Sequence, residues 1–379
     1  MNIDLTTIPT PCYVIDKTAL TRNLEILSSV QKKTSCKILL ALKAFAMFSV
    51  FPLIRSYLAG TAASSLDEAR LGHEEFKGET HVYTPAFKEE EFEQIIQYAD
   101  CINFNSFSQW QRFKPFVDSC KKDIRCGMRI NPEYSEVPVE IYNPCARYSR
   151  LGVTADAFRN QDLSGLSGLL FHTCCEQNVD ALERTLKVVE EKFGAYIGRM
   201  KWINFGGGQH ITQKNYDIEK LCALIVCFKK HYDVEVYLEP GEAVVLEAGV
   251  LVTSVLDIIK NEIDIAILDT SASAHMPDVL EMPYKPEIEG AAEKDRFPHT
   301  YRLGGLTCLA GDVIGDYSFP EPLKVGSKIV FRDMAHYTMV KNTTFNGVRQ
   351  PSIALYDPED GKIAIVRSFG FDEYKSRLS

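Results

Sequence analysis

The sequence lacks the features that mark membrane-spanning and exported proteins. A membrane helix needs about 18 consecutive apolar residues. The most apolar stretch, Ala243 to Ile259, is interrupted by Glu247 and Asp257. The N-terminal residues MNIDLTTIPTP contain neither the basic start nor the apolar core of a signal peptide. We therefore predict a cytoplasmic protein that does not use a membrane.

Positive charge is also scarce. The chain has 42 Lys and Arg against 51 Asp and Glu, a formal net charge of −9. This balance does not favour the broad basic surface that nucleic acids or anionic membranes require. We expect no nucleic-acid partner, and a cationic small molecule is the more compatible substrate.

Cysteines are present but do not form a pairing pattern. The eleven cysteines contain no C-x-x-C motif, and the only adjacent pair is Cys174 and Cys175. Such spacing does not favour a disulfide scaffold or a zinc site. We predict no metal, and most of these thiols should be reduced, buried and inert.

The chain does contain a regular alternation of short apolar strands and helices. Its 379 residues, 45% of them hydrophobic, are enough for two globular domains. Segments with helical spacing, such as Asp180 to Phe193 and Ile218 to Lys230, lie between most of the strands. Eight strands alternating with helices are typical of a (β/α)8 barrel, the TIM-like α/β fold. The eight runs are Lys37 to Leu42, Gly60 to Ala63, His81 to Thr84, Cys101 to Phe104, Ile124 to Ile130, Gly168 to His172, Trp202 to Phe205 and Val236 to Glu239.

Unusual residues fall at the C-terminal ends of these runs. Active sites of (β/α)8 barrels are built at that rim, so eight such ends in phase favour a catalytic barrel. The residues are Lys43, Ser64 with Ser65, Thr84, Asn103, Arg129, His172, the triplet Gly206-Gly207-Gly208, and Glu239.

After Glu239 the pattern changes to strands without long helices between them, which is typical of an all-β domain. Tyr13 to Asp16 could pair with these strands, which makes the second domain discontinuous. We predict an alanine racemase-like barrel over residues 21–248 and a β-sandwich or β-barrel domain over 1–20 and 249–379. The expected strands are Gly249 to Leu256, Ile263 to Leu268, Lys328 to Arg332, Ser352 to Tyr356 and Lys362 to Arg367.

Several of the rim residues have both a chemical and an ordinary interpretation. Burial of Lys43 favours the neutral amine that can attack a carbonyl, although a surface lysine is the simpler reading. The glycine triplet could bring backbone N–H groups to a phosphate or form a tight turn. Glu239 could hold a proton on a heterocyclic nitrogen, although taken alone a solvated loop acid is the more common case. His172 could stack on a planar cofactor, although a lone histidine is more often structural. Cys308 lies in a glycine-rich loop, where a small buried hydrophobe is the default.

Taken together, these motifs resemble the fold type III pyridoxal-phosphate decarboxylases, relatives of ornithine and diaminopimelate decarboxylase. The motifs keep their order over nearly the whole chain. Three further segments, Glu239 to Ala243, Leu268 to Asp278 and Leu303 to Asp316, look like those of the carboxynorspermidine decarboxylases. The shared motifs are Ala41-Leu42-Lys43-Ala44, Arg129-Ile130-Asn131-Pro132, Phe171-His172, Gly206 to Gly208, Glu239-Pro240-Gly241, the Cys308 to Asp312 loop and Ala335-His336-Tyr337.

The resemblance implies pyridoxal 5′-phosphate as cofactor and a homodimer with shared active sites. Lys43 would bind the cofactor covalently, His172 would stack on its ring, and Glu239 would keep its ring nitrogen protonated. Cys308 would come from the partner subunit and protonate Cα. The remaining cofactor-binding residues implied by the resemblance are Glu68, Arg129, Gly206, Gly207, Gly208, Gly241 and Tyr337.

The chain departs from the family pattern at a few positions. Glu242 stands where an Arg is common, and this change replaces an anion clamp by a group that prefers cations. Leu309 stands where ornithine and diaminopimelate decarboxylases place an acid. Ala62 and Cys175 replace an acid and a serine. We expect Glu242 and Asp278 to bind the substrate's ammonium groups, and His275 and Asp312 to be further substrate-binding residues.

The resemblance implies decarboxylation of carboxynorspermidine, carboxyspermidine or both, giving norspermidine or spermidine and carbon dioxide. The main alternative is a diaminopimelate or other basic amino-acid decarboxylase, against which Glu242 and Leu309 argue. A racemase and a regulatory homologue without turnover are further alternatives. Retention of Lys43, Glu239 and Cys308 speaks against the regulatory homologue.

Overall fold

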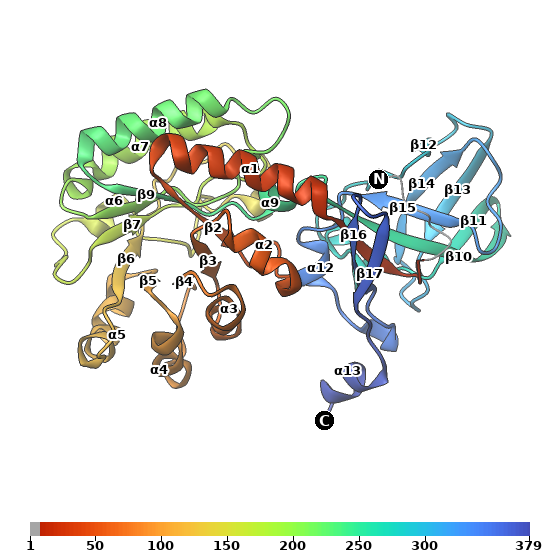
Figure 1. Cartoon of the computed structure of the whole chain (residues 1–379), viewed down its shortest axis with the longest axis horizontal. Helices are drawn as coiled ribbons and strands as arrows, with labels where there is room; N and C mark the ends of the chain where they lie inside the picture. The colour runs from red at the N-terminus through yellow and green to blue at the C-terminus, as the bar shows by residue number, and fades with distance from the viewer. Residues whose placement is uncertain (1–7) are drawn as a thin grey trace. The chain divides into compact units, whose positions relative to one another are not determined.

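The computed structural model describes residues 8–379, which divide into two compact units (Figure 1). One unit is residues 22–244, and the other combines residues 8–21 with 245–379.

The first unit is a closed barrel of eight parallel strands. Strand β2 pairs with β9, with Ile38 opposite Leu238, and this pairing closes the ring. The predicted (β/α)8 barrel is therefore confirmed. Its strands are β2 (Lys37–Ala41), β3 (Gly60–Ala63), β4 (Glu79–Tyr83), β5 (Cys101–Phe104), β6 (Arg125–Arg129), β7 (Gly168–Leu170), β8 (Trp202–Asn204) and β9 (Glu235–Leu238).

Helices follow most of these strands and bury one apolar face each. Helix α7 (Val179–Ile197) buries Leu182, Leu186 and Val189 at the expected helical spacing. Along residues 8–379, no helix has the length and apolar character needed to cross a membrane. The other helices in this part of the chain are α1 (Lys17–Thr34), α2 (Phe51–Arg55), α3 (Leu66–Leu71), α4 (Glu89–Tyr98), α5 (Phe107–Ser119), α6 (Ala155–Phe158), α8 (Ile218–Tyr232) and α9 (Glu242–Val245).

The interior of the barrel is filled by side chains, so it is a core and not a channel. The Trp202 indole occupies the middle of the barrel. A Cβ on Gly127 or Gly168 would lie 2.4 or 2.0 Å from that ring, so the indole fits only because both neighbours are glycine. Below it, Glu79 accepts hydrogen bonds from Lys37 at 2.6 Å and from Arg125 at 2.7 Å. With the middle and base of the barrel occupied, only the C-terminal rim can admit a ligand.

The second unit is built around a nine-stranded sheet in the order β12-β14-β13-β11-β10-β1-β16-β17, with β15 paired to β10. Strand β1 (Cys12–Asp16) pairs antiparallel with β10 (Gly249–Asn261) and parallel with β16 (Ser352–Asp357). The predicted pairing of Tyr13 to Asp16 with this domain is confirmed. The other strands are β11 (Ile263–Leu268), β12 (Ala292–Glu293), β13 (His299–Gly304), β14 (Val313–Phe319), β15 (Lys328–Arg332) and β17 (Lys362–Arg367).

Strands β13 and β14 were not among the expected strands. Each contains residues that are uncommon in strands, with Gly304 ending β13 and Gly315-Asp316 inside β14. These two strands pair antiparallel and enclose the loop that carries Cys308. The short helices of this unit are α10 (Ala272–His275), α11 (Asp278–Glu281), α12 (Thr338–Lys341) and α13 (Phe371–Ser376).

Candidate active site

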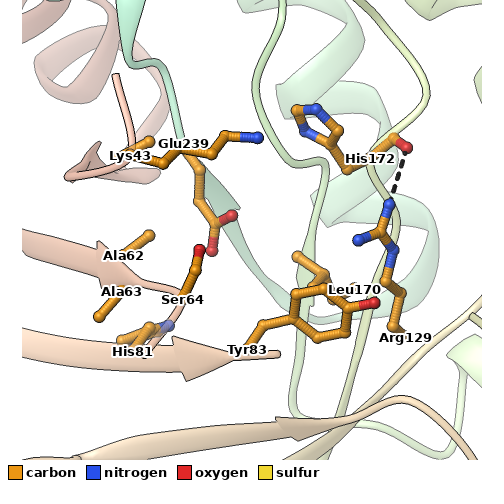
Figure 2. A pocket seen from close by; sticks show the side chains of 11 residues that line it. Lys43, Ala62, Ala63, Ser64, His81, Tyr83, Arg129, Leu170, His172 and Glu239 are labelled. Atoms are coloured by element: carbon orange, nitrogen blue, oxygen red, sulfur yellow. Dashed lines mark hydrogen bonds between the residues drawn. The ribbon is translucent and has the colours of Figure 1, made fainter. Parts of the chain in front are cut away.

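A recess of about 550 Å³, counted with its open mouth, lies at the C-terminal ends of the barrel strands (Figure 2). This is the rim that the sequence predicts. Polar residues from several strands converge on it, while alanines keep it open. The lining residues are Ala41, Lys43, Ala62, Ala63, Ser64, His81, Tyr83, Arg129, Leu170, His172 and Glu239.

Lys43 follows β2 and brings an amine to this recess. Its side chain is solvent-exposed where it lines the recess. Burial, followed by the positive charge of Arg129, lowers the pKa of Lys43, while Glu239 and Glu68 act in the opposite direction. The amine is therefore neutral at lower pH than an ordinary lysine, and a neutral amine is the form that attacks carbonyl groups.

Glu239 follows β9 and is held by its neighbour on β8. The side-chain amide of Asn204 donates from Nδ2 to Glu239 Oε1 at 2.6 Å. Burial raises the pKa of Glu239, and the Asn204 hydrogen bond and the charge of Lys43 oppose that rise. The carboxyl group is thus fixed in direction, with a pKa shifted toward that of a heterocyclic nitrogen.

His172 follows β7 with its protonation state set by the glycine loop. The Gly207 N–H donates to His172 Nδ1 at 2.9 Å, so Nδ1 carries no proton and the ring proton is on Nε2. Burial, and then the charges of Lys43 and Arg129, hold the pKa of His172 far below its usual value. His172 therefore presents a neutral, flat ring to the recess.

Two of the three N–H groups of the glycine triplet donate to side chains of the barrel rim. The Gly206 N–H donates to Asn204 Oδ1 at 2.8 Å, and the Gly207 N–H is taken by His172. Within residues 8–379, the Gly208 N–H has no protein acceptor. Gly208 has φ of +81°, and a Cβ there would lie 1.8 Å from Cys174 O, so only glycine fits. Two N–H groups position side chains, and the Gly208 N–H is left for a ligand.

Arg129 and Tyr83 form the wall opposite Lys43. The Arg129 guanidinium lies 4.6 Å from the centre of the Tyr83 ring and donates to His172 O at 3.4 Å. We expected Thr84 at this position of the rim, and Tyr83 lines the recess instead. Strand alternation could have identified it, because Tyr83 is two residues after the inward-facing His81.

Glu68 and Gly241 are two further expected cofactor-binding residues, and their contacts are with the chain around the rim. Glu68 accepts a hydrogen bond from the Ser64 N–H at 2.6 Å, and burial raises its pKa. A Cβ on Gly241 would lie 2.4 Å from the Cβ of Ala44, so glycine allows the chain after β9 to pack against the chain after β2.

Glu242 lies at the edge of this rim and is paired with a histidine. His210 Nε2 is 3.2 Å from Glu242 Oε1, and both side chains are largely buried. Burial raises the pKa of Cys175 to about 11, with Glu176 and Glu242 adding to the rise and Lys43 opposing it. Glu242 is therefore within electrostatic reach of the same thiol as Lys43.

Cys308 and Tyr337 belong to the second unit. Cys308 is exposed, and its backbone N–H donates to Asn346 Oδ1 at 2.8 Å. Tyr337 has φ of 45° and ψ of −51°, at the centre of a γ-turn closed by the Thr338 N–H and His336 O. A tyrosine rarely adopts this backbone conformation, and such strain is concentrated at functional sites.

The contacts of His275 and Asp312 favour a structural role over the expected substrate contact. His275 is fully buried, with Nδ1 3.1 Å from Thr270 Oγ1 and Nε2 3.0 Å from Arg349 O. Asp312 is also buried, and its oxygens accept hydrogen bonds from neighbouring loops. Asp278 agrees better with the expected role in substrate binding, although it already forms an ion pair with Lys341.

The rim fits the chemical parts of pyridoxal phosphate. Lys43 suits its aldehyde, His172 the face of its ring, Glu239 its ring nitrogen, and the Gly208 N–H its phosphate. The barrel and its rim thus define the class of pyridoxal-phosphate enzymes built on a (β/α)8 barrel with an added β domain.

Comparison with known proteins gives the particular family. Residues 12–335 match the family described as "Pyridoxal-dependent decarboxylase, C-terminal sheet domain". The chain belongs to the pyridoxal-dependent decarboxylases, and its cofactor is pyridoxal phosphate.

Similar proteins of known activity cover nearly the whole chain. The chain is 48% identical to the carboxynorspermidine/carboxyspermidine decarboxylase of Campylobacter jejuni, over 98% of both chains. It is 44% identical to the carboxyaminopropylagmatine decarboxylase of Synechocystis, over 100% of this chain and 97% of that one. The crystal structure of the Campylobacter jejuni carboxynorspermidine decarboxylase complexed with norspermidine has a TM-score of 0.91 at 46% identity, and it covers 98% of this chain and 100% of that one.

Proposed function

We propose that the chain decarboxylates carboxynorspermidine, carboxyspermidine or both, releasing carbon dioxide and leaving norspermidine or spermidine. The observation that carries this proposal is the 48% identity, over nearly the full length of both chains, to a relative named for those two substrates. The acid Glu242 at the rim supports a substrate with ammonium groups beyond its α-carbon.

A second candidate substrate is carboxyaminopropylagmatine, because the Synechocystis relative is 44% identical over the same length. That compound has the same amino-acid head but ends in a guanidinium instead of an ammonium. Diaminopimelate is disfavoured because its far end is a second amino acid, whose carboxylate Glu242 would repel. Comparing carbon dioxide release from these compounds separates the candidates.

The bound cofactor supplies a protonated aromatic ring that accepts the electrons left when carbon dioxide departs from Cα. Lys43 is the residue that would hold the cofactor, because its lowered pKa makes it a nucleophile. Glu239, directed by Asn204, would hold the proton on the ring nitrogen. His172 would pack its neutral face on the ring, which avoids adding a positive charge to that face. Arg129 would fix the position of His172 through its carbonyl.

Cys308 is our candidate for the proton donor to Cα, reaching the barrel of a partner subunit in a homodimer. Its surroundings favour an interface, because Leu306, Leu309 and Phe345 are 39%, 44% and 47% exposed near an exposed thiol. Apolar side chains grouped in this way are commonly covered by another protein surface. The cytoplasmic location expected from the sequence remains a prediction.

Mixing two inactive variants tests the shared site. Lys43→Ala and Cys308→Ala should each lose activity. If they are unfolded, mixed in equal amounts and refolded, half of the dimers carry one intact site of two, which restores about a quarter of wild-type activity. A mixture with no more activity than its components would contradict a site shared between subunits.

We also propose that Glu242 and Asp278 bind the ammonium groups of the substrate. Each already has a cationic neighbour in the chain, His210 for Glu242 and Lys341 for Asp278. A substrate ammonium would therefore share these carboxylates or displace the resident cation. In either case these acids bind the substrate more weakly than unpaired acids would, and they still select for cations.

A further inference from the structure

The loop that carries Cys308 is fixed by hydrogen bonds on both sides of the cysteine. On the cysteine itself, the backbone N–H donates to Asn346 Oδ1 at 2.8 Å. Asn346 is far away in the sequence, beyond strand β15 and helix α12, so this bond joins two separate segments of the second unit.

The preceding residue is fixed by Asp312. Thr307 donates to Asp312 Oδ2 from its hydroxyl at 2.6 Å and from its N–H at 3.2 Å. The same carboxylate accepts from Ser271 Oγ at 2.8 Å, and its other oxygen accepts from the Ser273 N–H at 3.2 Å. A Cβ on Gly305 would lie 2.3 Å from this carboxylate, so the loop closes tightly over Asp312.

The two anchors differ in what they fix. Asp312 is buried at 4% exposure and sets the overall course of the loop. Asn346 contacts the cysteine's own peptide, whose orientation sets where the side chain of Cys308 starts. Asn346 has φ of 56° and ψ of 14°, the left-handed region that asparagine tolerates better than most residues. The sequence therefore places an asparagine where both its side chain and its backbone are used.

We propose that Asn346 is a positioning residue that sets the direction of the Cys308 thiol. This inference rests on the proposed role of Cys308 as proton donor to Cα. After carbon dioxide leaves, the proton must go to Cα to give the polyamine. If it goes to the cofactor's carbon instead, hydrolysis with one water gives an aldehyde and pyridoxamine phosphate, and the enzyme is inactivated. A thiol held in one direction suppresses this second outcome.

Two substitutions of Asn346 separate the lost hydrogen bond from backbone strain. Asn346→Gly removes the acceptor but tolerates positive φ, whereas Asn346→Asp keeps an acceptor oxygen. Full-length protein loaded with cofactor is given carboxynorspermidine, and pyridoxamine phosphate is measured per carbon dioxide released. Asn346→Gly should raise this ratio about tenfold or more, because small misplacements of a reacting group are costly. Asn346→Asp should stay near the wild-type ratio.

The alkylation of Cys308 by iodoacetamide gives a second measurement that does not require turnover. Asn346→Asp places a new negative charge at the Cys308 peptide. A nearby negative charge disfavours the thiolate, so alkylation should need higher pH than in wild type. Asn160→Gly is the matched control, because Asn160 is an exposed asparagine with φ of 59° on the barrel. It should change neither measurement.

The outcomes distinguish the two levels of the proposal. A wild-type product ratio in folded Asn346→Gly overturns the positioning role. If Cys308→Ala itself keeps the wild-type rate and ratio, the proton-donor role fails, whatever Asn346 does. A changed ratio in Cys308→Ala with an unchanged ratio in Asn346→Gly leaves the donor role standing and removes only Asn346.

Discussion

The side-chain amide of Asn204 connects the glycine loop to Glu239. Its Nδ2 donates to Glu239 Oε1 at 2.6 Å, while its Oδ1 accepts from the Gly206 N–H at 2.8 Å. Because both ends of the amide are used, it cannot rotate without losing a hydrogen bond in a buried site. The direction of Glu239 is therefore set by a residue that the sequence alone did not single out.

Removing this amide should shift the acid side of the pH profile. Burial raises the pKa of Glu239 and the Asn204 bond opposes that rise, so Asn204→Leu should raise the pKa further. The carboxylate is the form that holds a proton on a ring nitrogen, and activity is lost as pH falls through this pKa. We expect kcat to fall about 10- to 100-fold and its acidic limb to move to higher pH. Asn103→Ala, which removes a buried amide from β5 on another part of the barrel, should leave the limb in place.

Lys43→Ala should abolish covalent attachment of the cofactor. Purified wild-type protein should show a visible absorption band that borohydride bleaches, and the variant should lack it. Because burial lowers the pKa of Lys43, attachment in the wild type should persist to lower pH than with an ordinary lysine. A wild-type protein that stays colourless with added pyridoxal phosphate would contradict the assignment of Lys43.

Glu79→Gln should destabilise the barrel and alter its response to acid. Burial tends to raise the pKa of Glu79, but hydrogen bonds from His81, Lys37 and Arg125 outweigh it and hold the pKa well below its usual value. Its contribution is therefore full above the unfolded-state pKa of about 4.3 and is lost as pH falls below it. Urea unfolding at pH 7 should show a loss of about 1–3 kcal/mol in the free energy of unfolding.

The difference between wild type and Glu79→Gln should shrink as the pH is lowered toward 4 and beyond. Glu235→Gln is the control, since Glu235 is 54% exposed and 3.9 Å from Lys37 Nζ. It should change stability by no more than about 0.5 kcal/mol. Equal losses in both variants would contradict a special contribution of Glu79 to the stability of the barrel.

Glu242→Gln should raise KM for the polyamine substrate about tenfold, because it removes the negative charge that attracts a substrate ammonium group. The affinity for the cofactor should change little. Glu176→Gln, which changes an acid near the same thiol, serves as the control. Comparable losses of substrate and cofactor binding in Glu242→Gln would assign Glu242 to the cofactor instead.

Much of this architecture could be predicted because it follows from periodicity. The eight strands and the rim residues Lys43, Arg129, His172 and Glu239 follow directly from apolar runs and the positions where they end. The sequence placed Thr84 at the rim, where the structure has Tyr83. The error is one residue, because the end of a strand is less well defined by sequence than the alternation of its side chains. Asn204, Asn346 and His210 act through partners distant in the sequence, which only the folded chain brings together.

Carbon dioxide release from a panel of substrates under identical conditions tests whether the chain decarboxylates carboxynorspermidine or carboxyspermidine. The panel contains carboxynorspermidine, carboxyspermidine, carboxyaminopropylagmatine, ornithine, lysine and diaminopimelate. We predict the highest kcat/KM for carboxynorspermidine or carboxyspermidine, which differ by one methylene worth about 1–3 kcal/mol, and far lower values for the three amino acids. A highest kcat/KM for carboxyaminopropylagmatine would assign the second candidate function, and a highest value for diaminopimelate, ornithine or lysine would contradict the account.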